Sequence, residues 1–188
     1  ALDVLAHVAK NTYDLVENDV SRDSFLMPHF VNTMIEKKLL GKKVQGGFYK
    51  TDLTPDWQKI RKVIDPATLE YTEYEFASFP CLDAAKKTKT LPEKMQAVVY
   101  GNDKGAQFTW KAVANNLIYA ANRIPEISDT IVEIDNALKW GFNFEMGPFE
   151  TWDAIGLAKS IEKMEKDGLA VPQKVKKMLA AGNTAFYK

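Results

Sequence analysis

Apolar residues recur every three to four positions along most of the chain, which is the spacing of an amphipathic helix. This pattern predicts a helix over about residues 2–18 and a second from Pro28 to Leu40, with Gly41 as its stop. A longer helix is expected over about residues 107–121, where apolar side chains occupy several faces, as in the centre of a bundle. The first half of the pattern therefore favours helices.

The second half of the chain predicts further helices with clear boundaries. Thr130 and Glu133 have the spacing of a capping box, and the helix that they begin is expected to end at Gly141. A short helix is expected from Pro148 to Gly156, with another helix directly after it. The last helix should run from about Pro172 to Ala181, with a glycine as its stop.

The helical pattern weakens between Thr51 and Thr90. Three prolines and the Tyr/Glu-rich patch LEYTEYEF interrupt the periodicity there. We interpret this stretch as a connecting region with short helices. The predicted organisation is therefore residues 1–50 as the second half of a first helical repeat, 51–90 as the connection, and 91–188 as a second helical repeat.

An internal repeat supports this organisation. Each copy has a proline-started helix, a glycine after it and then Phe-Tyr-Lys, at residues 48–50 and 186–188. The matched helix positions are Pro28, Val31 and Met34 in the first copy and Pro172, Val175 and Met178 in the second. In this alignment Ala1 falls opposite Gly156, so the first copy lacks the part before that glycine. The predicted fold class is all-α, a helical bundle built from two related units with the first one incomplete, and chance matching is the alternative.

Composition narrows the class of protein. The 25 basic and 25 acidic residues cancel, so no overall field favours nucleic acid or an anionic membrane surface. A single cysteine, Cys81, excludes an internal disulfide and a cysteine-rich metal site. No run of about 18 apolar residues occurs, and the first residues form an amphipathic stretch and not a signal peptide. These observations predict a cytoplasmic protein without a metal, a nucleic-acid partner or a membrane span.

The most informative motif is IDNALKWGFNFEMGPFETWDAIGL, residues 134–157. Glycine before proline permits a tight turn, Pro148 can begin a helix, and Phe149 can be buried against the preceding helix. Asp153 is placed to accept hydrogen bonds in the turn. For Asp135 and Asp153 we favour a structural role, as carboxylates that satisfy loop amides, over a catalytic one.

This motif resembles the helical domain of the 3-hydroxyacyl-CoA dehydrogenases. The segment GKKVQGGFYK, residues 41–50, is similar to the family's glycine- and lysine-rich turn before Phe-Tyr, although Gln45 stands where the family often has glycine. The resemblance covers nearly the whole chain and implies the helical C-terminal (central) region of such an enzyme, truncated at its N-terminus. The motif residues that carry it are Ile134, Asp135, Ala137, Gly141, Gly147, Pro148, Phe149, Asp153 and Gly156.

The resemblance also implies chemistry that this chain lacks. The family uses NAD bound to a Rossmann domain and a histidine-carboxylate pair that transfers the proton. The sequence has no G-x-G-x-x-G after a strand, and His7 and His29 have no matched carboxylate, so we expect no catalytic, cofactor-binding or metal-binding residue. Lys42 and Lys43 could reach a phosphate of the CoA substrate, or they belong to a solvated turn.

The resemblance therefore implies the substrate-side and dimerisation portion of an NAD-dependent 3-hydroxyacyl-CoA dehydrogenase of fatty-acid β-oxidation, inactive alone. The partners that it suggests are the missing Rossmann domain, a 3-hydroxyacyl-CoA substrate, a fused enoyl-CoA hydratase domain and a second copy of the chain. The alternative is a helical interaction or dimerisation module without catalysis of its own. The Gly-Pro-Phe and Phe-Tyr signatures argue against a different dehydrogenase with a helical C-terminal domain.

Overall fold

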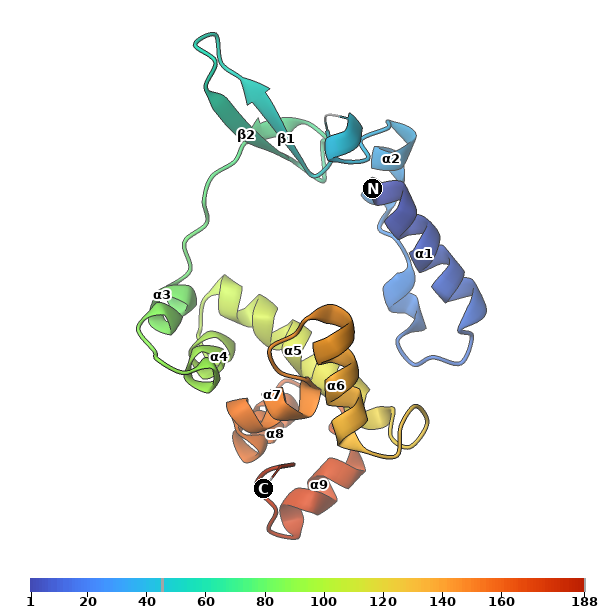
Figure 1. Cartoon of the computed structure of the whole chain (residues 1–188), viewed down its shortest axis with the longest axis vertical. Helices are drawn as coiled ribbons and strands as arrows, with labels where there is room; N and C mark the ends of the chain where they lie inside the picture. Colours follow the sequence, from blue (N-terminus) through green and yellow to red (C-terminus); the bar gives the residue numbers. More distant parts are fainter. Residues whose placement is uncertain (45, 188) are drawn as a thin grey trace. The chain divides into compact units, whose positions relative to one another are not determined.

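A computed structural model describes residues 1–44 and 46–187 of the chain (Figure 1). The chain divides into two compact units, Ala1–Ala77 and Ser78–Lys188. Gln45, the departure from the family's glycine, and Lys188, the last residue of the second Phe-Tyr-Lys, lie outside the described residues.

The first unit combines helices with a small antiparallel sheet. The strand order is β1-β2-β3, with Tyr49 opposite Val63 and Ile64 opposite Tyr71. Leu2, Val31, Met34 and Ile64 form its buried core, so the sheet packs with the helices through one strand end. The elements are α1 (Leu2–Leu15), η1 (Arg22–Phe25), α2 (His29–Glu36), η2 (Lys42–Val44), β1 (Tyr49–Leu53), β2 (Lys59–Ile64) and β3 (Tyr71–Glu73).

The sheet shows that the predicted all-α fold class is wrong: the protein is mixed, with helices and a three-stranded sheet. All three strands fall at the start of, or inside, the stretch that we interpreted as a connection with short helices. Exposed and half-buried residues alternate along β1 and most of β2, which is the period of a strand. Because the longest strand has six residues, this alternation is too short to dominate a helix-length window.

The second unit is helical. Thr90 and Glu93 form a reciprocal capping box at the start of α4, and the Asp103 side chain accepts the Ala106 N–H at the start of α5. Its elements are α3 (Pro80–Lys86), α4 (Leu91–Val99), α5 (Lys104–Asn122), α6 (Ile131–Phe142), α7 (Pro148–Ile155), α8 (Leu157–Lys166) and α9 (Gln173–Ala180).

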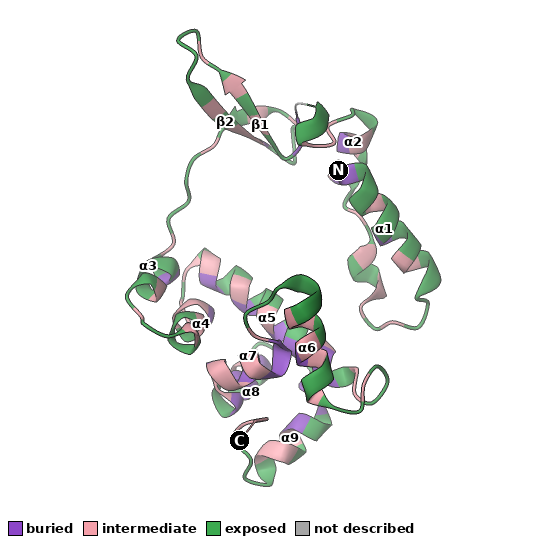
Figure 2. Cartoon of the chain, in the orientation of Figure 1, coloured by how far each residue is buried: buried purple, intermediate pink, exposed green. Residues whose placement is uncertain are grey.

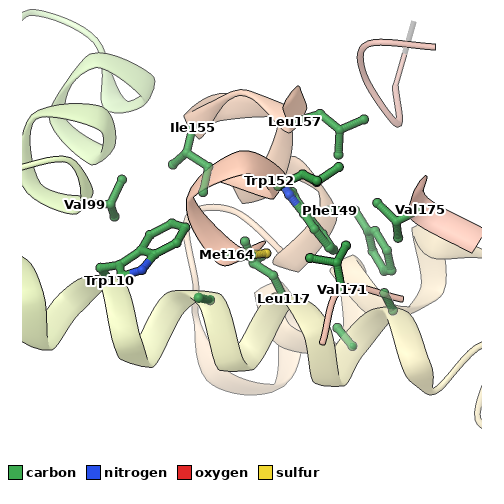
Figure 3. Close-up of a cluster of buried hydrophobic side chains, with 14 residues drawn as sticks. Val99, Trp110, Leu117, Phe149, Trp152, Ile155, Leu157, Met164, Val171 and Val175 are labelled. Atoms are coloured by element: carbon green, nitrogen blue, oxygen red, sulfur yellow. The ribbon is translucent and has the colours of Figure 1, made fainter. Parts of the chain in front are cut away.

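One face of α5 and the buried residues of α7 and α8 build most of the core of this unit (Figures 2 and 3). The buried positions of α5 recur at intervals of three and four residues, which makes one continuous face. Phe149, Trp152 and Ile155 of α7 are at most 1% exposed. Each such side chain contributes about 1.5–3 kcal/mol on burial, so α7 stabilises the unit out of proportion to its length. The buried face of α5 consists of Ala106, Trp110, Ala114, Leu117, Ala120 and Ala121.

Several helix ends differ from the predicted ones. The helix α6 continues through Gly141 to Phe142 and ends at Asn143, which takes the left-handed conformation with φ 57°. Thr130 is its N-cap but makes no capping bond with its side chain. The helix α2 ends at Glu36, before Gly41, and the left-handed residue after it is Lys38. The helix α9 ends close to the predicted place.

Candidate functional site

The carboxylate of Asp135 on α6 is the centre of the residues 134–157 motif. Its side chain is buried, with 1% of the residue exposed. It accepts hydrogen bonds from the N–H groups of Phe149 (2.8 Å) and Glu150 (3.1 Å), and from the hydroxyl of Tyr187 (2.7 Å). Three donors thus converge on one buried carboxylate.

Two of these donors belong to the first turn of α7, where backbone N–H groups have no partner within the helix. Pro148 occupies the first position and has no N–H, and Gly147, the N-cap residue, has no side chain to cap the turn. Asp135 therefore caps α7 from a neighbouring helix. Glu150 completes the turn by accepting the Gly147 N–H at 2.9 Å.

Gly147 is required by the close approach of α6 to this turn. A β-carbon added at Gly147 would lie 2.3 Å from the Cα of Asp135 and 2.4 Å from its Cβ. These atoms belong to backbone and a buried side chain, so they cannot move aside at low cost. The Gly-Pro-Phe sequence is thus explained residue by residue: close approach, a helix start without an N–H, and a buried ring.

Asp153, further along α7, holds a second segment. Its two carboxylate oxygens accept the backbone N–H groups of Phe186 (2.8 Å) and Tyr187 (2.9 Å). The ring of Phe186 lies against Phe149 and Trp152, with centroids 4.9 and 5.4 Å away. We call Asp135, Asp153, Phe186 and Tyr187 the carboxylate clamp. It fixes the Phe-Tyr segment after α9 to α6 and α7.

Asp135 is the buried member of the clamp, and its burial dominates the electrostatics there. Burial raises the pKa of Asp135, although its three donors favour the ionised form. Burial and the adjacent Asp135 carboxylate raise the pKa of Tyr187 well above its ordinary value. Burial opposes ionisation of Glu150, but the bond from Lys139 lowers its pKa overall. Both oxygens of Asp135 and both oxygens of Asp153 are engaged as hydrogen-bond acceptors.

The remaining motif glycines occupy different positions. Gly156 has φ 90° and joins α7 to α8, so it serves as the end of one helix and the start of the next. Gly141 lies within α6 with open space around it. Across the α7–α8 junction, the indole N–H of Trp152 donates to the Ser160 hydroxyl at 2.7 Å, and that hydroxyl donates to the Leu157 carbonyl.

The two candidate phosphate-binding lysines lie in the first unit, in η2. Both are exposed. Lys42 lines a groove beside β1, whereas Lys43 is not part of its lining. Neighbouring backbone is held by the Gly41 N–H, which donates to the Gly46 carbonyl at 2.7 Å.

The second unit also has an apolar pocket of about 520 Å³. It lies between α4, α5 and the loop at residues 143–148, and its wall is mostly carbon, with Leu91, Met95 and Val113 among the lining residues. His7 and His29 are exposed in the first unit. Within residues 1–44 and 46–187, no three His, Cys, Asp or Glu side chains gather as a metal site requires.

Sequence reasoning found Asp135, Asp153 and the Gly-Pro-Phe turn but missed several partners. Glu150 and Tyr187 were not singled out, and neither was Ser160. The sequence identified Phe186 and Tyr187 only as part of a repeat. The residues around Asp153 do not indicate that its hydrogen-bond donors lie more than 30 positions away. A Glu three residues after Gly147 was the one local signal available.

This geometry defines a helical domain whose motif residues serve its architecture. The family model for the 3-hydroxyacyl-CoA dehydrogenase C-terminal domain matches residues 108–184. Residues 108–184 therefore belong to that family of domains, which confirms the resemblance seen in residues 134–157.

Curated relatives extend the similarity to the whole chain. A Bacillus subtilis (strain 168) protein named "Probable 3-hydroxyacyl-CoA dehydrogenase" is 43% identical over 186 residues, which are 99% of this chain and 23% of that protein. A Rickettsia felis protein named "Putative fatty acid oxidation complex trifunctional enzyme" is 31% identical over 72% of this chain and 17% of its own length. The chain thus spans about a quarter or less of these relatives. No solved structure matches it.

The described residues contain no helix with the length and apolar character needed to cross a bilayer.

Proposed function

We propose that this chain is the substrate-side portion of an NAD-dependent 3-hydroxyacyl-CoA dehydrogenase of fatty-acid β-oxidation. The observation that supports the proposal most strongly is the similarity along 99% of the chain to a relative of that name. The clamp supports it in a second way, because the motif that resembles the family makes the hydrogen bonds that hold α6, α7 and the Phe-Tyr segment together.

In this proposal the chemistry belongs to a nucleotide-binding domain outside this sequence. NAD would supply the hydride acceptor there, and a histidine-carboxylate pair would move the proton. The role of this chain is to hold the substrate side of the enzyme in a defined shape. A fused hydratase domain is part of the proposal, because the Rickettsia relatives carry the name of a trifunctional fatty acid oxidation enzyme.

A chimera tests the proposal directly. The 186 matched residues of the Bacillus subtilis relative are replaced by this chain, and oxidation of NADH with acetoacetyl-CoA is measured. We expect the chimera to retain activity and the isolated chain to show none. A folded chimera that binds NADH but reduces no acetoacetyl-CoA, beside an active parent, would contradict the proposal. Activity in the isolated chain would contradict the assignment of the chemistry to another domain.

Exposed aromatic residues favour a second candidate function, an interaction or dimerisation module. Trp140, Phe142 and Phe144 are 81%, 73% and 51% exposed around the end of α6, and the rings of Phe142 and Phe144 lie 6.5 Å apart. Clustered aromatic surface is typical of protein interfaces. We expect concentration-dependent self-association that Trp140→Glu weakens.

Analytical ultracentrifugation measures this association. Trp57→Glu, which changes an equally exposed tryptophan of the first unit, is the matched control. A monomer whose sedimentation is independent of concentration would contradict the second candidate.

A further inference from the structure

A groove of about 730 Å³ follows the outer side of β1 in the first unit. β1 lies at one end of the β1-β2-β3 order, so no described strand pairs with its outer edge. The groove takes residues from both faces of the sheet, which places it around this free edge. Its lining residues are Lys42, Tyr49, Lys50, Thr51, Asp52 and Arg61.

The groove carries net positive charge. Lys42, Lys50 and Arg61 line it together with one carboxylate, that of Asp52. Asp52 is already shared by Lys62 at 2.9 Å and Lys50 at 3.2 Å, and these bonds lower its pKa. The negative charge of Asp52 is therefore neutralised within the hairpin by Lys50 and Lys62, and the other two cations of the lining are Lys42 and Arg61.

Two aromatic rings hold the Arg61 side chain. Its guanidinium lies over the ring of Tyr49, 4.3 Å from the centroid, and 4.8 Å from the centroid of Tyr74. Among the described residues no carboxylate pairs with Arg61 or Lys42. A stacked guanidinium loses little entropy on binding and keeps its N–H edge available for a phosphate.

The backbone of β1 adds neutral donors. The Ile64 N–H donates to the Phe48 carbonyl at 2.9 Å, which sets the alternation of the β1–β2 ladder. In an antiparallel pair every second residue bonds the partner strand, so the N–H groups of Tyr49 and Thr51 point toward the free edge. Backbone amides together with cationic side chains are the chemistry of an anion site.

We propose that this groove binds a phosphorylated adenine nucleotide, specifically the 3′-phosphoadenosine diphosphate portion of CoA. The choice of CoA rests on the proposed function, whereas the anion chemistry rests on the groove itself. The volume falls within the range of about 300–1,000 Å³ of small-molecule sites. Lys42 and Arg61 meet the phosphates, and the half-exposed ring of Tyr49 holds the Arg61 guanidinium at the groove.

Isothermal titration calorimetry of the 188-residue chain tests this site with four probes: CoA, dephospho-CoA, pantetheine and ATP. We expect CoA to bind, dephospho-CoA to bind more weakly because it lacks the 3′-phosphate, and pantetheine not to bind. Loss of one charge-assisted contact lowers the affinity for an anion by roughly tenfold or more. We therefore expect Arg61→Met and Lys42→Met each to lower the affinity for CoA by that factor. Lys10→Met, which removes the same charge from α1, should leave the affinity unchanged.

Circular dichroism of each variant shows whether the fold is retained. An Arg61→Met chain that folds and binds CoA as tightly as the parent would overturn the proposal. Equal loss in Lys10→Met would also overturn it, because the effect would then follow net charge. ATP binding as tight as CoA binding would overturn the assignment to CoA. An acidic peptide that binds while CoA does not would overturn it in favour of strand addition at the β1 edge.

The two proposals fail separately. If the chimera is active but the isolated chain binds no CoA, the nucleotide site is refuted and the proposed function is retained. If the chimera is inactive but the isolated chain binds CoA through Arg61, the proposed function is refuted and the nucleotide site is retained.

Discussion

Gly147 and Asp135 are packed so closely that a β-carbon on the glycine would lie 2.3 Å from the Asp135 Cα. The contact joins the start of α7 to the middle of α6 and brings the Asp135 carboxylate to the two amides that it caps. The capping of α7 by Asp135 of α6 thus depends on the absence of a side chain at Gly147. The stability of the second unit should be sensitive to any atom added there.

We expect Gly147→Ala to lower the free energy of unfolding by about 2 kcal/mol or more, because the added methyl group forces α6 and α7 apart. Gly141→Ala is the matched control, since that glycine lies in α6 with open space around it. Alanine there should add about 0.5–1 kcal/mol through its helix propensity. Urea unfolding followed by tryptophan fluorescence measures both. Equal effects of the two substitutions would contradict the packing argument.

Asp153→Asn should free the segment after α9. The amide side chain keeps one good acceptor, so at least one of the Phe186 and Tyr187 N–H bonds is weakened. We expect amide exchange of these two residues to accelerate by about tenfold or more, because a bond to a charged group contributes about 1.5–3 kcal/mol. Hydrogen exchange read by NMR measures it. Asp129→Asn, at an exposed carboxylate, should leave both amides unchanged, and protection retained in Asp153→Asn would refute the clamp.

Ser160→Ala should cost about 1–3 kcal/mol, because it leaves the buried indole N–H of Trp152 without its acceptor. The double variant Trp152→Phe/Ser160→Ala separates this loss from packing. If the hydrogen bond is responsible, Ser160→Ala should cost much less in the Trp152→Phe background. Thermal unfolding of the four chains gives the cycle, and simple additivity would argue against the bond.

The stability of the second unit should fall at alkaline pH through Tyr100. Its hydroxyl donates to the Ile155 carbonyl at 2.9 Å, and burial raises the pKa of Tyr100 from 10.0 to about 12. The unfolded phenol ionises near pH 10, so the stability present below that pH is lost as the pH rises from 10 toward 12. The loss should be about 1–2 kcal/mol.

Tyr100→Phe removes this dependence, so the difference in unfolding free energy between the two chains should shrink above pH 10. Urea unfolding at pH 8, 10 and 11 measures the difference. A constant difference across this range would show that Tyr100 does not titrate as its burial requires.

The sequence predicts the helices better than the sheet, for reasons that particular residues illustrate. The helix α9 has a proline before it, a glycine after it and a clear apolar face, so local signals define it. The strand β2 is short, and only one of its residues, Ile64, is buried. The predicted end of α6 at Gly141 was wrong because a left-handed asparagine, Asn143, serves as its stop.

The motif at residues 134–157 was predictable from the sequence, because few residue types other than glycine and proline fit a tight turn at the start of a helix. Asp135 and Gly147 act on each other across 12 positions, and both stand out in the sequence. The donors to Asp153 come from a segment whose packing is not visible locally, so the partners in the clamp required the structure. The groove beside β1 depends on the strand order, so it could not be predicted from the sequence either.

The clamp also has a consequence for synthesis on the ribosome. The start of α7 can contact α6 once residue 150 has left the exit tunnel, because the amides of Phe149 and Glu150 that Asp135 caps are then available. Asp153, in contrast, has no partners until Phe186 and Tyr187 leave the exit tunnel. In the nascent unit α7 is therefore capped before Asp153 is bonded, and the emergence of Phe186 and Tyr187 from the exit tunnel completes the clamp.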